Sequence, residues 1–151
     1  MPSTTSLVTK LQHDFPAYTF QSSTDFHWSP QENTIFYDTK SEDSASLLHE
    51  LAHAVLKHQN YTKDIILIEM ERDAWHYASS TLGPQYKITI NDDTVQLSLD
   101  TYRDWLHARS TCPQCKATGV QTQKSHYKCV LCSTKWRVND ARICALRRYT
   151  L

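Results

Sequence analysis

The chain has 151 residues, enough for a small catalytic core with a metal-stabilised module but not for two full-sized domains. Hydrophobic residues make up 40% and charged residues 21%, close to globular averages, so neither the disordered nor the membrane-protein class is indicated. The formal net charge is zero, which excludes a global attraction to nucleic acid or anionic membranes and leaves only local patches.

The amino-terminal stretch and the cysteines bear on the cellular compartment. Residues 1–13 contain no long apolar run and no small-residue cleavage site, so we expect no signal peptide. The longest apolar stretch, residues 65–68, is far too short to span a bilayer. Four of the five cysteines form two CxxC pairs, which favours metal binding in a reducing compartment over a disulfide scaffold. We therefore expect a cytoplasmic protein without membrane contact.

The first third of the chain predicts a helix, a small sheet and a second helix. Residues 6–14 have apolar residues at helical spacing, and Pro16 follows them. Three short β-prone runs between residues 18 and 38 predict a two- or three-stranded antiparallel sheet. Residues 41–57 predict a helix that has Ser41 or Ser44 as its N-cap.

The middle of the chain predicts a further helix, a segment that suits either a strand or a helix, and a connecting helix. Residues 63–82 carry apolar residues at helical spacing, and Gly83 and Pro84 predict the end of this helix. Residues 87–90 and 94–99 favour a strand or hairpin, with a helix as the alternative. Residues 100–108 predict a short connecting helix.

The sequence His49-Glu50-Leu51-Ala52-His53 is an HExxH motif in the middle of a predicted helix. It places two imidazoles one turn apart on the same face, the separation that lets both reach one zinc ion. Glu50 would then lie beside the metal, where it can take a proton from water. The alternative is an amphipathic helix that carries two surface histidines.

A catalytic zinc needs a third protein ligand and an open position. The metzincin extension of the motif is excluded because Leu56 and Gln59 occupy its glycine and histidine positions. His58 is expected to point off the ligand face, as an exposed or capping residue. The next predicted helix offers the carboxylates Glu69, Glu71 and Asp73.

The segment from Glu71 to Ala78 resembles the ExxAxxxA second helix of gluzincin peptidases, especially the ImmA/IrrE family. The resemblance covers about residues 44–80 and implies that Glu71 is the third zinc ligand. Trp75 departs from the small polar residue common in these families. SprT-like proteases are the second resemblance, since they join a similar motif to a zinc ribbon, but they use a third histidine, and no histidine lies between His58 and His76.

These resemblances imply peptide-bond hydrolysis with Glu50 as general base. Stabilisation of the oxyanion needs a further donor, for which His76, Tyr77 and Tyr61 are candidates, each with a core role as the alternative. Asp73 is a candidate to orient a histidine ligand, whereas Glu69 is interpreted as part of a solvated helix face.

Cys112, Cys115, Cys129 and Cys132 form two CxxC pairs separated by 13 residues, the spacing of a zinc ribbon. Four thiolates close the coordination shell, so this second zinc is predicted to be structural. Residues 119–123 and 133–138 predict strands of the ribbon. The odd Cys144 is interpreted as a small buried hydrophobe.

The ribbon and tail are locally basic. Residues 111–151 contain eight Lys and Arg but only one acidic residue, Asp140, with Tyr127, Trp136 and Tyr149 between them. Such a surface favours nucleic-acid contact through phosphates and stacking. The alternative is that the aromatic residues pack the ribbon and the cations keep it soluble.

Together these patterns predict an α+β protein: a minigluzincin-like core at residues 1–99, a connecting helix at 100–110, and a zinc ribbon with a basic tail at 111–151. Two zinc ions and an intracellular protein substrate are expected. The ImmA/IrrE resemblance implies cleavage of a DNA-bound regulator, and the SprT resemblance implies proteolysis of DNA-associated proteins. The competing hypothesis is a non-enzymatic module that binds nucleic acid or protein.

Overall fold

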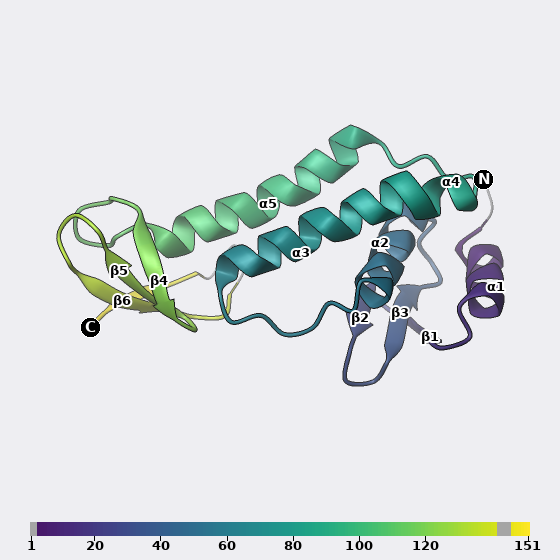
Figure 1. The fold of residues 1–151 in the computed structure, drawn as a ribbon, viewed down its shortest axis with the longest axis horizontal. Coiled ribbons are helices and arrows are strands. Elements are labelled where there is room, and N and C mark those ends of the chain that lie inside the picture. The colour runs from purple at the N-terminus through teal and green to yellow at the C-terminus, as the bar shows by residue number, and fades with distance from the viewer. Residues whose placement is uncertain (1–2, 142–145) are drawn as a thin grey trace. The chain divides into compact units, whose positions relative to one another are not determined.

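The computed structural model describes residues 3–141 and 146–151 (Figure 1). The chain divides into two compact units: Met1–Gln59 with Met70–Val95, and Asn60–Glu69 with Gln96–Leu151. The expected boundaries after residues 99 and 110 stay a prediction. Cys144, interpreted from sequence as a buried hydrophobe, lies outside the described residues.

The first unit begins with helix α1, Thr4–Asp14. Ser3 caps it by accepting a hydrogen bond from the Ser6 backbone N–H at 3.2 Å. Leu7, Val8 and Leu11 are buried, which confirms the predicted amino-terminal helix.

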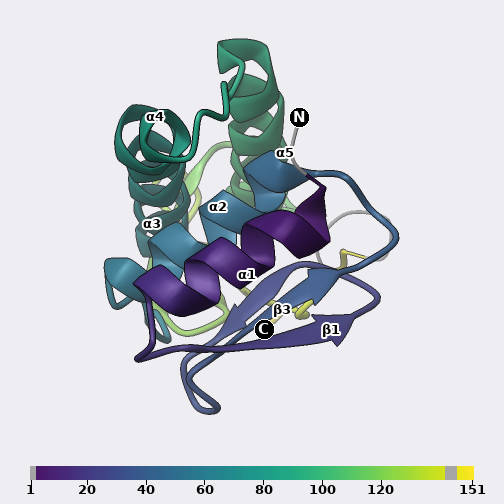
Figure 2. The same cartoon turned by 90° about the vertical axis from the view of Figure 1, so that its right-hand side faces the viewer.

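A three-stranded sheet follows, with strands β1 (Thr19–Ser23), β2 (His27–Ser29) and β3 (Thr34–Asp38) in the order β1-β3-β2. The sheet is mixed: β2 pairs with β3 antiparallel, whereas β1 pairs with β3 parallel. The prediction of a purely antiparallel sheet was therefore wrong in this detail. Its register places Phe20 beside Ile35, and both are buried. Helices α1 and α2 cover one face of the sheet (Figure 2). Burial of this non-local apolar pair contributes to holding β1 against β3.

Helix α2 spans Ser44–Val55 and packs its apolar stripe, including Leu47, Leu48 and Leu51, into the core. Its N-cap is Asp43, which accepts hydrogen bonds from the Ser46 N–H at 2.9 Å and the Ser46 hydroxyl at 2.6 Å. The cap is therefore neither Ser41 nor Ser44. Asp43 has the advantage of a charge at the positive end of the helix dipole.

Helix α3, Asp64–Tyr77, continues without a break into a π-helical turn, Ala78–Leu82, and a short helix α4, Gly83–Gln85. Gly83 and Pro84 do not end the helix as predicted. Gly83 has a helical φ of −54°. Pro84 lies in the first turn of α4, where its missing backbone N–H costs no hydrogen bond within that helix. The glycine is needed for space instead, because a Cβ there would lie 2.6 Å from the Ile88 carbonyl oxygen.

Helix α5 spans Asp92–Ser110, so the strand or hairpin hypothesis for residues 94–99 was wrong and the helical alternative correct. Asn91 starts the helix, because its side-chain oxygen accepts a hydrogen bond from the Asp93 N–H at 2.7 Å. The acidic pair Asp92 and Asp93 then lies in the first turn and Arg109 in the last, an order that the helix dipole favours.

The carboxyl-terminal ribbon is a four-stranded antiparallel sheet, β4 (Gly119–Gln123), β5 (His126–Cys129), β6 (Lys135–Val138) and β7 (Arg148–Thr150), in sequential order. The two predicted ribbon strands are confirmed. One face of the sheet packs a small core. Its members are Cys112, Tyr127, Cys129, Trp136 and Val138.

The α+β class is confirmed, since helices pack on one mixed sheet and a separate antiparallel sheet carries a four-cysteine cluster. Among the described residues, no helix combines the length and the apolar character that a membrane crossing requires.

Candidate metal centres

Helix α2 presents His49 and His53 to the interior of the first unit. Both are buried, with 5% and 6% of their surface exposed. Because they lie four residues apart on one helix, their rings meet edge to face with centroids 4.5 Å apart. Their Nε2 atoms are 3.1 Å apart, so the two imidazoles aim the same nitrogen at one point.

Helix α3 brings the buried Glu71 to the same point. Its Oε2 lies 2.9 Å from His49 Nε2, and its Oε1 lies 3.2 Å from His53 Nε2. Ligand atoms about 2.0–2.1 Å from a zinc ion in tetrahedral geometry are separated by roughly 3.3 Å, close to these spacings. The donor set of two imidazoles and one carboxylate therefore fits a zinc ion.

The protonation of Glu71 and His49 suits a metal site, whereas for His53 burial acts to lower the pKa but the hydrogen bond to Glu71 outweighs it and raises the pKa. Burial acts to raise the pKa of Glu71, but hydrogen bonds from His49 and His53 outweigh it and lower the pKa to about 2. Burial also lowers the pKa of His49, against the opposing effect of Glu71. A carboxylate and a neutral imidazole are the forms that bind metal.

Glu50 lies beside this cluster and within 4.8 Å of both histidines, measured between single donor atoms. Its Oε2 accepts a hydrogen bond from the Trp28 backbone N–H of β2 at 2.9 Å. Burial raises its pKa to about 7. Glu50 and Glu71 differ in their contacts. Glu71 contacts the Nε2 atoms of both histidines, whereas the Glu50 carboxylate is hydrogen-bonded to the backbone of β2. A carboxyl that titrates near neutrality is suited to accept and return a proton.

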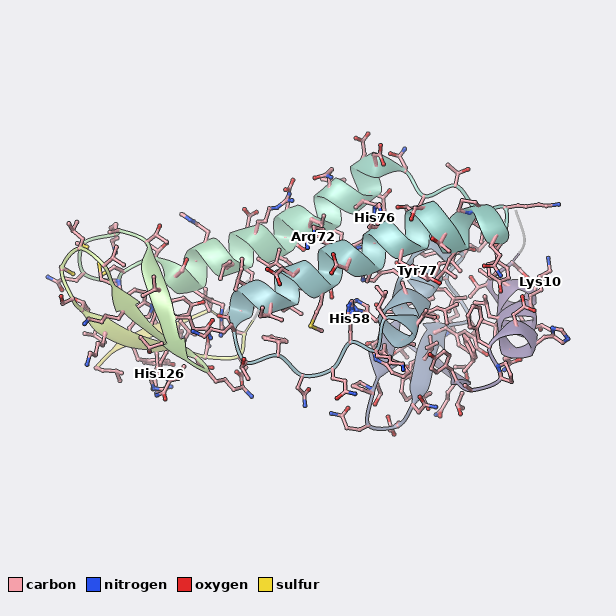
Figure 3. The ribbon with its side chains drawn as sticks, in the orientation of Figure 1. Lys10, His58, Arg72, His76, Tyr77 and His126 are labelled. Atoms are coloured by element: carbon pink, nitrogen blue, oxygen red, sulfur yellow. The ribbon has the colours of Figure 1, made fainter. Side chains whose placement is uncertain are left out.

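His58, labelled in Figure 3, contacts His53, with 2.8 Å between the two Nδ1 atoms. Its backbone caps α2, as one of the two expectations had it, and its ring meets the Nδ1 side of His53, not the Nε2 atoms that face Glu71; the imidazole is half-buried rather than exposed. Lys57 has a φ of 58° and reverses the chain at the end of α2, which carries His58 back onto the helix. The sequence gives no glycine or asparagine at residue 57 that would signal this turn.

Trp75 covers His49, its ring stacked at a centroid distance of 4.0 Å and an interplanar angle of 22°. The Nδ1 atom of His49 is buried and has no hydrogen-bond partner among the described residues. Sequence reasoning noted Trp75 only as a departure from the family pattern. Its position on α3, four residues after Glu71, is the signal that could have placed it near the ligands.

The other candidate residues on α3 are more exposed than Glu71. Glu69 and His76 are exposed, and Tyr77 is half-buried. Asp73 is exposed and pairs with Arg72 at 3.1 Å. Tyr61, the other candidate oxyanion donor, is half-buried in the second unit. The structure therefore adds nothing in favour of an oxyanion role for His76, Tyr77 or Tyr61.

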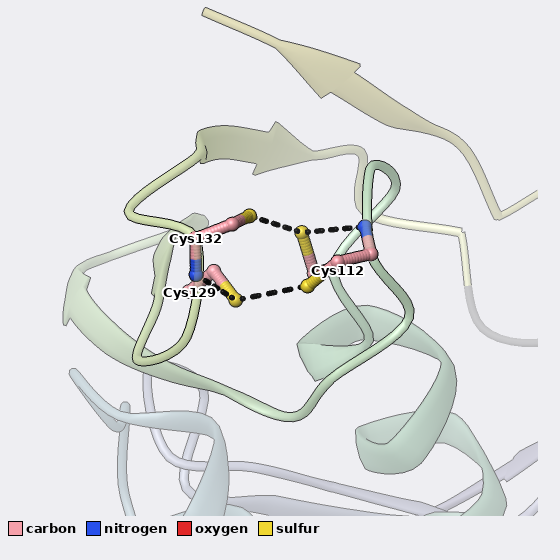
Figure 4. A group of neighbouring side chains, drawn as sticks. Cys112, Cys129 and Cys132 are labelled. Carbon is pink, nitrogen blue, oxygen red and sulfur yellow. Dashed lines mark hydrogen bonds between the residues drawn. The ribbon is translucent and has the colours of Figure 1, made fainter.

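The four predicted cysteines of the ribbon form a second cluster, with all four sulfur atoms within 4.8 Å of one another. Cys112 and Cys132 are 3.7 Å apart and Cys115 and Cys129 are 3.5 Å apart, measured between Sγ atoms (Figure 4). All four thiols are free. Zn–S bonds of about 2.3 Å place tetrahedral sulfurs roughly 3.8 Å apart, so the cluster fits a zinc ion.

The backbone has the same conformation and hydrogen bonds at both CxxC pairs of the ribbon. The first cysteine of each pair accepts hydrogen bonds from backbone N–H groups of the next turn, at 3.4 and 3.5 Å for Cys112 and at 3.3 and 3.4 Å for Cys129. The residue after each pair, Lys116 or Ser133, has a positive φ of 68° or 64°. Hydrogen bonds from Thr134 lower the pKa of the Cys132 thiol to about 6. These donors stabilise thiolates, the form that binds metal.

Comparisons of the chain with protein-family models, with curated proteins and with solved structures find no significant match. What the two clusters can do therefore follows from their chemistry. Two histidines and a carboxylate leave a tetrahedral zinc one open position, whereas four thiolates fill it. The protein thus has two groups of side chains compatible with zinc, one of the open and one of the closed type.

Proposed function

We propose that this chain is a zinc metallopeptidase of the gluzincin type that hydrolyses peptide bonds in a protein substrate. The observation that carries the proposal is the convergence of His49, His53 and Glu71, with Glu50 alongside. The two histidines and Glu71 would hold a catalytic zinc, and the four cysteines a structural one.

Glu50 is the general base of the proposed reaction. When bound, zinc is a Lewis acid that polarises a carbonyl and makes water acidic enough to ionise near neutral pH. Glu50 takes the proton of the attacking water on its carboxylate and passes it to the departing amine. The burial that raises the pKa of Glu50 makes its carboxylate a stronger base, and the positive charge of a bound zinc ion would oppose that rise and keep it ionised before the transfer.

The position of β2 favours a peptide as the substrate. This strand forms one edge of the three-stranded sheet, and its Trp28 N–H donates to Glu50. Edge strands bind extended peptides through their free backbone groups. Glu50 already accepts from the Trp28 N–H, so a peptide would pair with other backbone groups of β2 and lie beside the general base.

Zinc content and activity together test the proposal. Wild type should hold about two zinc ions per chain and the double variant His49→Ala/His53→Ala about one, because the sites are separate. Glu50→Gln should keep both zinc ions and the fold while it lowers cleavage of a proteome-derived peptide mixture by roughly 10²–10⁴-fold. Glu69→Gln, which changes an exposed carboxylate on α3, is the matched control.

Two results would contradict the proposal. One zinc ion in both wild type and the double variant would show that only the ribbon is loaded. Cleavage by Glu50→Gln at the wild-type rate would remove the general base from the mechanism. Either result would favour a non-enzymatic binding module.

A nucleic-acid-binding role for the ribbon is favoured by one observation. The face of the ribbon sheet opposite its core exposes Lys128 and Lys135, which are directly paired, and Arg137. Arg137 lies 4.2 Å over the ring of its cross-strand neighbour Tyr149. Cations beside an exposed aromatic ring suit phosphates and bases of a single strand. This face would direct the peptidase to a DNA-associated or regulatory protein.

A further inference from the structure

The two nitrogens of His53 have different surroundings. Its Nε2 faces Glu71 and His49, whereas its Nδ1 faces His58 at 2.8 Å. A neutral imidazole has one donor and one acceptor nitrogen. If Nε2 binds metal, as the proposed function requires, Nδ1 must carry the proton and donate it to His58.

We propose that His58 is a positioning residue: its Nδ1 accepts the hydrogen bond from His53 and so sets both the tautomer and the ring orientation of that ligand. This inference rests on the proposed function of the His49, His53 and Glu71 site. Partners of this kind commonly control metal affinity, and most are carboxylates or carbonyls. Here a second imidazole takes that place.

The backbone of His58 is held from two sides. Its N–H donates to the His53 carbonyl at 3.0 Å, and the Lys57 N–H donates to the Ala54 carbonyl at 3.0 Å, which together form a Schellman motif. The His58 carbonyl accepts a hydrogen bond from the Trp28 indole at 3.0 Å. Both polar groups of the His58 backbone are therefore satisfied, and the imidazole is attached to a fixed point.

The Trp28 indole that holds His58 is itself fixed. Tyr18 packs against it edge to face with ring centroids 5.8 Å apart, and the Tyr18 hydroxyl donates to the Ala54 carbonyl at 3.3 Å. The same Trp28 holds Glu50 through its backbone N–H. One residue of β2 therefore positions both the general base and the residue that orients His53.

The other ligand histidine lacks a comparable hydrogen bond. Within the described part of the chain, His49 Nδ1 has no partner, and Trp75 stacks on the ring. The His53–His58 contact is thus the hydrogen bond through which the surrounding protein holds an imidazole ligand. Its loss should weaken the proposed zinc site more than a surface change of equal size.

Two substitutions separate hydrogen bonding from packing. His58→Asn keeps an acceptor, because the asparagine Oδ1 is as many bonds from the backbone as the histidine Nδ1. His58→Leu keeps a similar volume without an acceptor. The matched control is His13→Leu, since His13 is exposed and contacts only its neighbour Asp14 among the partners that the structure describes.

The readout is the zinc retained per chain across a series of chelator concentrations, with circular dichroism to verify folding. The ribbon zinc is the internal reference, because its four cysteines are unchanged. A parallel cobalt titration separates the sites, since only the cysteine site gives thiolate-to-metal charge transfer. We expect His58→Leu to lose the non-ribbon zinc at roughly 10–100-fold lower chelator concentration. His58→Asn and His13→Leu should stay near wild type.

The possible results of these zinc measurements test the role of His58 and the proposed catalytic site separately. Wild-type retention of zinc by His58→Leu would overturn the positioning role, and so would an equal loss in His58→Asn and His58→Leu, which would indicate packing alone. A wild-type protein with only the ribbon zinc would instead refute the proposed catalytic site. Failure of the two proposals is therefore distinguishable.

Discussion

Trp75 is the residue that most distinguishes the surroundings of this metal cluster. Its indole is 4% exposed and lies nearly parallel to the imidazole of His49. Aromatic pairs of this kind contribute roughly 0.5–1.5 kcal/mol beyond the burial of their area. The His49 Nδ1 lacks a hydrogen-bond partner among the described residues, so stacking on Trp75 and the contact of Nε2 with Glu71 together limit rotation of this ring.

We therefore expect Trp75→Leu to weaken both zinc binding and folding, and Trp75→Phe to preserve most of both. The leucine variant should lose about 2–4 kcal/mol of unfolding free energy, the usual cost of truncating a buried tryptophan. Denaturant unfolding and chelator competition measure the two effects separately. Trp105→Leu, at a buried tryptophan of the second unit, should lower stability but leave the histidine-bound zinc unchanged. Equal zinc affinity in the Trp75 and Trp105 variants would contradict the stacking role.

The sequence was informative for residues whose relation depends on helix geometry alone. His49, Glu50 and His53 belong to one helix, so their spacing determines how they lie. His58 could not be placed in this way, because its position depends on the positive φ of Lys57 and on an indole from β2. A lysine in a sequence does not indicate a positive φ, whereas a glycine would.

At the scale of elements, one buried charge network joins the start of α3 to the end of α5 and to the ribbon, all within the second unit. Asp64 Oδ2 accepts hydrogen bonds from Arg109 Nε at 2.8 Å and from the Tyr127 hydroxyl at 2.6 Å. Arg109 also donates to the Asn139 carbonyl, and its own carbonyl accepts from the Trp136 indole. Burial, together with the hydrogen bond to Asp64, raises the pKa of Tyr127.

We expect Asp64→Asn to destabilise the second unit by about 3–5 kcal/mol, because it leaves the buried Arg109 without its counter-ion. Tyr127→Phe should cost less, about 1.5–3 kcal/mol, the range for one lost hydrogen bond to a charged group. Denaturant unfolding of zinc-loaded protein measures both. Asp100→Asn, which breaks the exposed pair with Arg103, should cost less than about 1 kcal/mol. A loss in Asp64→Asn no larger than this control would show that the network is not stabilising.

Predictions of the elements succeeded where the signal was local and periodic, as in α1, α2 and the ribbon strands. They failed where a local pattern had two solutions. Asn91, Asp92 and Asp93 suit a hairpin turn, yet the same residues start α5 because the asparagine side chain caps it. The parallel pairing of β1 with β3 depends on Phe20 meeting Ile35, a contact between strands that no local pattern encodes.

At the scale of the whole molecule, charge is unevenly distributed along a chain that is neutral in total. Residues 111–151 hold eight of the 16 basic residues but only one of the 16 acidic residues. The proposed metallopeptidase core is therefore acidic, and the ribbon with its tail is basic. A polyanion would be attracted to the ribbon and repelled by the core, which is the charge distribution expected if this module recruits substrates bound to nucleic acid.

If the exposed face of the ribbon binds nucleic acid, the number of cations in contact with phosphates sets how strongly the affinity depends on salt. Each cation that contacts a phosphate of a single strand contributes about 0.7 to the slope of log affinity against log salt. Lys128→Ala/Lys135→Ala should therefore weaken binding of a single-stranded oligonucleotide and lower that slope by roughly 1.4. Fluorescence anisotropy over a range of salt concentrations measures both. Lys40→Ala, at an exposed lysine of the first unit, should change neither. An unchanged slope in the double variant would show that nucleic acid does not contact Lys128 and Lys135. Absence of binding by the wild type would contradict the nucleic-acid role, and the cations would then serve solubility alone.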